Sequence, residues 1–167
     1  MKKIFFYPAT LLIGLILNIF WDNYFSINGV SPQLTLLVLI YLSLREGPLI
    51  GEVWGFFAGL SLDVFTSGPF GAQGLFFTVT GFAIGMLKGK MEEDNYLAIA
   101  LLVVLTSWFS LISFIVVQNI FSTLSVRSIN WIYWIAIPIY NIILAPVIYL
   151  VLGKWQDLWQ SSKNGKL

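Results

Sequence analysis

The chain contains neither cysteine nor histidine among its 167 residues. Without cysteine it has no disulfide, thiol chemistry or cysteine-based zinc site, and without histidine it lacks the usual acid or base of neutral-pH catalysis. Charged residues are also scarce, at 10% of the chain, and the nine basic and eight acidic residues leave a net charge of +1. Nucleic-acid binding requires a strongly basic surface, so we exclude that class of partner.

Apolar residues take the place of the missing charges. They make up 58% of the chain, and the mean hydropathy is +0.86, well above that of ordinary soluble domains. The strict alternation of barrel strands is absent, so the sequence predicts an all-α integral membrane protein with one polytopic domain over residues 1–167. We predict six transmembrane helices at about 4–21, 27–44, 48–65, 70–87, 96–122 and 131–152, and a cytoplasmic interfacial tail over 153–167.

The distribution of basic residues predicts the orientation of these spans, because loops rich in Lys and Arg stay in the cytoplasm. A cytoplasmic N-terminus leaves only Arg127 outside. It places the other eight basic residues inside, namely Lys2, Lys3, Arg45, Lys88, Lys90, Lys154, Lys163 and Lys166. Both termini are then cytoplasmic. The first span resembles a secretory signal but lacks a small-residue cleavage site, so we expect it to be retained.

Turn-forming residues mark several boundaries. Ser31 and Pro32 offer an N-cap and a first helical residue for the second span, and Pro48 starts the third. The segment 66–71, with sequence TSGPFG, predicts a tight outer turn. It makes the third and fourth spans an antiparallel hairpin.

Small residues recur every four positions along this hairpin. Glycine is a poor helix former in water, but in a bilayer it lets helix backbones approach closely. The fourth span repeats the pattern on roughly one face. We predict either that these two spans pack against each other or that they receive a partner's helix. The helix-packing residues are Gly47, Gly51, Gly55, Gly59, Gly74, Gly81 and Gly85.

Two acidic residues lie within the third span. Glu52 and Asp63 are eleven residues apart, which puts them on nearly the same helix face as Gly55 and Gly59, so we expect both carboxylates to point into the packed side. They are about 16 Å apart along the axis, too far for a two-carboxylate hydrolytic pair. We expect Asp63 to be a structural pin of the outer turn, together with Gly68, Pro69 and Gly71. Glu52 reaches either interfacial water or a functional contact, because a carboxylate inside a span is costly.

Uncharged polar residues are scattered over the spans. Such side chains usually hold helices together, and Gln73 and Asn141 are the candidates that we single out for this role. No nucleophile has a base beside it, and no metal-ligand cluster or phosphate loop is present. We therefore predict no catalytic, cofactor-binding or metal-binding residue, and no enzymatic activity.

The segment Pro32–Leu75 resembles the rod shape-determining protein MreD family. The resemblance is carried by the Leu-rich second span that ends in LREG, the Gly-rich third span that closes in GLSLD, and the outer turn GPFG. Length, number of spans and the basic N-terminus are also similar.

This resemblance implies a non-enzymatic protein of the bacterial inner membrane that takes part in elongating the lateral cell wall. The implied direct partner is the bitopic protein MreC, and the indirect partners are MreB filaments, RodA and a class B penicillin-binding protein. The implied fold is similar to the substrate-binding membrane subunits of energy-coupling-factor vitamin transporters.

Two functions therefore remain open. The first is an adaptor whose Gly-rich hairpin binds the transmembrane helix of an MreC-like partner. The second is a vitamin-binding transporter subunit with cavity groups at Gln73, Gln118, Asn119 and Asn141. In such subunits the small residues that dock the energising partner usually lie in the first span, where this chain has only Gly14, which favours the adaptor.

Overall fold

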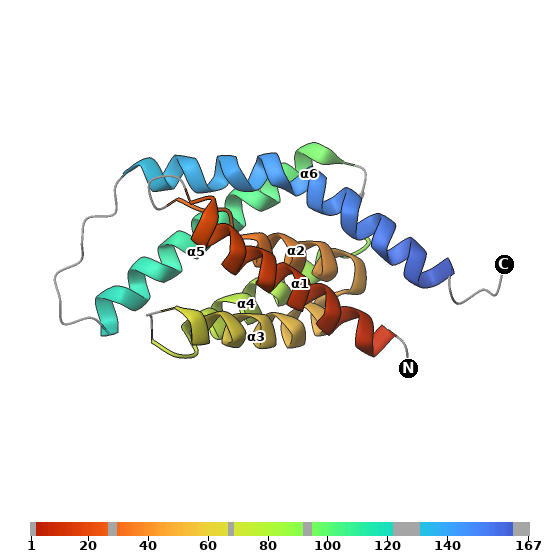
Figure 1. The fold of residues 1–167 in the computed structure, drawn as a ribbon, viewed down its shortest axis with the longest axis horizontal. Coiled ribbons are helices and arrows are strands. Elements are labelled where there is room, and N and C mark those ends of the chain that lie inside the picture. The colour runs from red at the N-terminus through yellow and green to blue at the C-terminus, as the bar shows by residue number, and fades with distance from the viewer. Residues whose placement is uncertain (1–2, 27–29, 67–68, 92–94, 122–130, 162–167) are drawn as a thin grey trace.

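The computed structural model describes residues 3–26, 30–66, 69–91, 95–121 and 131–161, and these ranges form six α-helices (Figure 1). In chain order the helices are α1 (Lys3–Tyr24), α2 (Leu34–Glu46), α3 (Pro48–Phe65), α4 (Ala72–Gly85), α5 (Tyr96–Phe121) and α6 (Trp131–Ser161). The prediction of an all-α protein is confirmed for the described part of the chain.

Three of the described helices are long and apolar enough to cross a membrane. They contain the segments Pro48–Phe65, Tyr96–Val117 and Trp131–Gln156, and α4 is apolar but shorter. The 13 residues of α2 span only about 20 Å, less than the ~30 Å of the hydrocarbon core. The molecule is therefore a membrane protein, while six full crossings stay a prediction.

Helix boundaries follow the sequence closely in α3 and less closely in α2. The third span begins and ends where predicted, at Pro48 and Phe65. The predicted start of the second span is wrong, because residues 30–33 are not helical and α2 begins at Leu34; residues 27–29 lie outside the described ranges. The backbone of Gln33 is held in a non-helical conformation while its N–H donates to Asn141 of α6, which delays the first turn.

The ends of the other helices also shift. In α4 the helix covers Ala72–Gly85 rather than 70–87, and α1 runs to Tyr24 rather than to residue 21. The tail predicted as a separate interfacial segment is a direct continuation of α6 as far as Ser161. Along its length α6 bends, as Figure 1 shows, and it carries Pro138 and Pro146.

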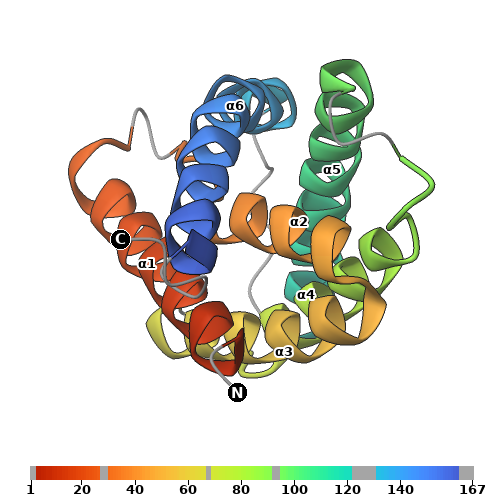
Figure 2. The same ribbon diagram turned by 90° about the vertical axis from the view of Figure 1, so that its right-hand side faces the viewer.

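The centre of the molecule is α2. Every residue from Leu34 to Leu44 is buried. Figure 2 shows the other helices arranged around it, and α1, α3, α4 and α6 all pack against it. A helix that is apolar on all sides is buried on all sides, and here its surroundings are protein.

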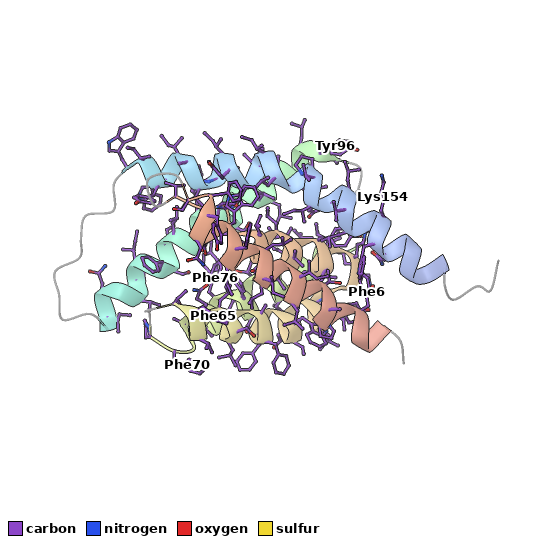
Figure 3. All side chains as sticks on the ribbon, viewed as in Figure 1. Phe6, Phe65, Phe70, Phe76, Tyr96 and Lys154 are labelled. Carbon is purple, nitrogen blue, oxygen red and sulfur yellow. The ribbon has the colours of Figure 1, made fainter. Side chains whose placement is uncertain are left out.

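The two ends of the bundle differ in character. Figure 3 places Phe65 and Phe70 at one end and Phe6 and Lys154 at the opposite end. At the second end the Arg45 guanidinium donates to Gln156 over 2.9 Å, which ties α2 to α6. Three residues predicted to be cytoplasmic belong to this end, namely Arg45, Lys154 and Lys88, whose side chain lies against Gly47. The identity of the side that faces the cytoplasm stays a prediction.

Candidate functional site

The most extensive helix contact in the described structure joins α3 and α4 along a single seam. From Gly51 onward each four-residue step along α3 meets a four-residue step back along α4, so the two antiparallel helices keep one register. The four rungs pair Pro48 with Gly85, Gly51 with Gly81, Gly55 with Phe77, and Gly59 with Gln73. At each rung a Cβ built on the glycine would come within 3.0 Å of the facing helix's backbone atoms.

Only hydrogen fits at these positions, because the facing atoms are backbone and do not move aside as side chains do. At Gly55 the facing atom is the carbonyl oxygen of Phe77, which is the arrangement of a Cα–H···O contact between close helices. Gly74 faces the side chain of Leu60 and is less constrained, whereas Gly47 is required chiefly by its φ of +98°.

Of the two roles expected for the glycines, packing between α3 and α4 is the one that this arrangement shows. Gly51, Gly55 and Gly59 are buried against α4, so the glycine face is not open to the helix of another protein. The inner face of the hairpin is therefore occupied by the contact between its own two helices.

Asp63 closes the far end of the seam. Its side chain is only 4% exposed and accepts three backbone hydrogen bonds from the start of α4. The N–H groups of Gly71 and Gly74 donate to Oδ2 over 3.0 and 3.1 Å, and that of Gln73 donates to Oδ1 over 3.1 Å. The N-cap residue of α4, Gly71, has no side chain to do this. Asp63 therefore caps the neighbouring helix, and its negative charge faces the positive end of the α4 dipole.

The turn between the two helices depends on its glycine and on a backbone hydrogen bond. Gly71 has a φ of +94°, which a residue with a side chain rarely adopts, and the carbonyl of Pro69 accepts the N–H of Ala72 over 3.2 Å. The fourth predicted turn residue, Gly68, lies outside the described residues.

Glu52 does not share the surroundings of Asp63. It follows Gly51 directly and is therefore rotated about 100° away from the seam, where it is half-buried. The expectation that both carboxylates point into the packed face is wrong for Glu52, because the seam winds around α3 and leaves this position on its flank.

A second helix start is also capped from elsewhere in the chain. The N-cap residue of α2, Gln33, has no capping side chain, and its N–H donates to Oδ1 of Asn141 over 2.9 Å. Asn141 is fully buried and donates through Nδ2 to Ser107 Oγ over 2.8 Å. The N–H of Thr35 is accepted by Asn18 Oδ1 of α1 over 3.3 Å. Side chains of α6 and α1 thus accept two of the amides at the start of α2.

Comparison with known proteins identifies the family. A family model described as rod shape-determining protein MreD matches residues 2–156. The chain belongs to the MreD family. The resemblance of the Pro32–Leu75 segment is thereby confirmed, and it extends over nearly the whole chain. The curated proteins and the solved structures each gave no match.

Membership in the MreD family gives the chain a role in rod shape determination. The family consists of shape-determining membrane proteins that are not known for catalysis. The matched residues include α1 to α5 and α6 as far as Gln156, so both capped helix starts and the whole glycine seam lie within the family region.

The polar groups expected to line a ligand cavity in this MreD-family chain have separate surroundings. Gln73 donates to Thr66 over 3.4 Å at the turn, Asn141 belongs to the buried network of α2, and Asn119 is exposed and bonded to its own helix. The side chain of Gln118 lies outside the described residues. Among the residues that the structure describes, no three acidic side chains gather as metal ligands.

Residues that sequence reasoning did not single out complete the α2 network, above all Gln33 and Ser107. The sequence carries no local signal for them, because Ser31 and Pro32 indicate an earlier helix start, whereas the uncapped amides begin at Gln33.

Replacing Asn141 with leucine is expected to lower the free energy of unfolding by about 2–3 kcal/mol, because the N–H of Gln33 and the hydroxyl of Ser107 both lose a buried partner. Thermal unfolding of the purified protein in mild detergent measures the change. The matched control is Asn119→Leu on α5, where the exposed amide bonds only to the carbonyl of Ile115. Equal stability of the two variants would show that the network contributes nothing.

Proposed function

We propose that this chain is a non-enzymatic adaptor of the bacterial cell-wall elongation machinery and binds an MreC-like bitopic partner through the α3–α4 hairpin. It acts as a multi-pass protein of the inner membrane. Through that partner it is linked to MreB filaments, RodA and a class B penicillin-binding protein.

The observation that carries this proposal is the close packing of the hairpin. Its inner side is a backbone-to-backbone seam, and its turn is fixed by the three hydrogen bonds to Asp63. A surface that is already ordered loses little conformational freedom when it binds, which favours association. Pre-ordering matters in a bilayer because the hydrophobic effect does not drive helices together in lipid, so their association depends on close packing of complementary shapes.

The face available to a partner is the outer side of the hairpin. Apolar side chains of both helices project from it. Its aromatic rings form ridges against which another helix can pack. The exposed residues are Leu49, Val53, Phe56 and Phe57 on α3, Leu75, Val79 and Phe82 on α4, and Met86 directly after α4. The partner's single helix lies along this surface, on the side away from α2.

Photocrosslinking in cells tests this assignment. A photoreactive amino acid at Val53 or Val79 is expected to capture the MreC-like protein, because both positions lie on the proposed contact surface. Positions Leu101 on α5 and Leu150 on α6 are exposed, apolar controls, and we expect several-fold less product there. Each variant must first restore rod shape in depleted cells, which shows that it is folded. Capture from the controls but not from the hairpin would refute the proposed surface.

A further inference from the structure

Glu52 is a carboxylate within a candidate membrane span that has no partner among the described residues. Within the described part of the chain it makes no hydrogen bond and no ion pair, whereas Asp63 on the same helix accepts three hydrogen bonds. An acidic residue within a transmembrane helix normally pairs with another group or serves a function. The fold itself leaves Glu52 unused.

The depth of Glu52 can be read from the helix. It is the fifth residue of α3, so it lies about 6 Å along the axis from Pro48. That end of α3 is the one where Arg45 and Lys88 lie, which the sequence predicts to be cytoplasmic. The carboxylate is thus just inside the predicted inner boundary of the membrane.

The side of the hairpin on which Glu52 lies is equally defined. Phe82 follows Gly81 on α4 as Glu52 follows Gly51 on α3, and because the helices are antiparallel the two side chains lie on the same flank of the seam. Phe56, one turn along from Glu52, is 44% exposed, and Phe82 is 45% exposed. Glu52 therefore lies half-buried on the outer face of the hairpin, beside apolar side chains.

A basic side chain described at this end, Lys88, leaves that carboxylate free. Lys88 lies against Gly47 and forms no ion pair with Glu52. Anionic lipid headgroups would be repelled by the negative charge of the Glu52 carboxylate. A positively charged group from another molecule is the complementary occupant.

We propose that Glu52 pairs with a Lys or Arg at the cytoplasmic end of a single-pass partner's transmembrane helix and so sets the depth at which that helix docks. This inference rests on the proposed function and deepens it. A helix that enters the bilayer from the cytoplasm carries basic residues at its inner end, which is the depth of Glu52. Their long side chains reach along the membrane boundary, and the low dielectric there strengthens an ion pair.

The test measures recovery of the MreC-like partner with the full-length chain from mild detergent. Glu52→Lys is expected to reduce recovery about tenfold or more, because like charges then face each other. Glu52→Gln, which removes the charge and keeps the shape, is expected to reduce it several-fold. Changing the innermost basic residue of the partner's span to Glu should restore recovery with Glu52→Lys. Absence of that rescue would overturn the charge pairing.

Two controls separate this inference from the proposed function. Lys154→Glu reverses an exposed charge on α6 at the same end of the bundle and should leave recovery unchanged. Unfolding temperatures of all variants show whether a loss of binding reflects a loss of fold. If the unmodified chain does not recover the partner, the proposed function fails; if it does and Glu52→Lys recovers equal amounts, only the pairing fails.

Discussion

Leucine at Gly81 is expected to destroy the α3–α4 hairpin and with it the folded protein. A Cβ at this position would overlap the carbonyl oxygen of Gly51, and a Cβ at Gly51 would overlap that of Gly81. Because both obstacles are backbone, the helices must separate along the whole seam. Even alanine should cost about 1–3 kcal/mol by overpacking, and leucine more. Thermal unfolding in detergent and the yield of monodisperse protein measure the effect.

The chain offers a matched control for this experiment in Gly153 of α6. No atom lies within 4 Å of a Cβ built there, so Gly153→Ala meets no steric obstacle. Alanine is the better helix former by about 1 kcal/mol in water, and the variant should be at least as stable as the unmodified chain. If Gly81→Ala and Gly153→Ala unfold at the same temperature, close packing at the seam does not stabilise the protein.

Removal of the Asp63 carboxylate is the second change with a large expected effect. In Asp63→Ala the N–H groups of Gly71, Gln73 and Gly74 lose their acceptor in a site that is almost inaccessible to solvent. Charge-assisted hydrogen bonds to a helix start are among the stronger kind, and we expect a loss on the order of 3–5 kcal/mol. In this variant, hydrogen exchange at these three amides should accelerate more than exchange at amides in the middle of α4.

Asparagine at position 63 separates the contribution of the carboxylate charge from that of the side chain's size. Asp63→Asn keeps the size of the side chain and one accepting oxygen, but its amide nitrogen would face one N–H donor and its charge is gone. We expect a stability between those of the unmodified chain and Asp63→Ala. Asp22→Asn, at an exposed position where the new amide oxygen can still accept from Asn18, should change the unfolding temperature little. An Asp63→Asn variant as stable as the unmodified chain would mean that charge plays no part in the cap.

Local patterns in the sequence predict the hairpin well. The spacing of Gly51, Gly55 and Gly59 indicates close helix packing, and the Gly47-Pro48 pair fixes where α3 begins. These features are local because a small residue, a turn and a cap each act within a few helical turns. A hydrogen-bonding role for Asp63 at the turn follows from the same short-range reasoning.

The place of α2 could not be predicted in this way. Hydropathy measures only whether a side chain avoids water. Because lipid and the protein interior are equally apolar, a central helix and a lipid-facing span have similar hydropathy. The start of α2 was also hidden, because it depends on Asn141, far along the chain. No spacing rule connects Gln33 with a residue of the last helix. The flank position of Glu52 likewise depends on how the seam winds around α3.

The caps of α4 and α2 can form at different times during synthesis of the chain. Asp63 is separated from the amides it accepts by only 8 to 11 residues, so the turn of the hairpin can close as soon as α4 begins to form. The N–H of Gln33 must wait for Asn141, which is made 108 residues later. At 5–20 residues per second this delay is roughly 5–20 s. A chain that stops before α6 would therefore contain a completed hairpin beside a central helix whose first turn is still unfinished.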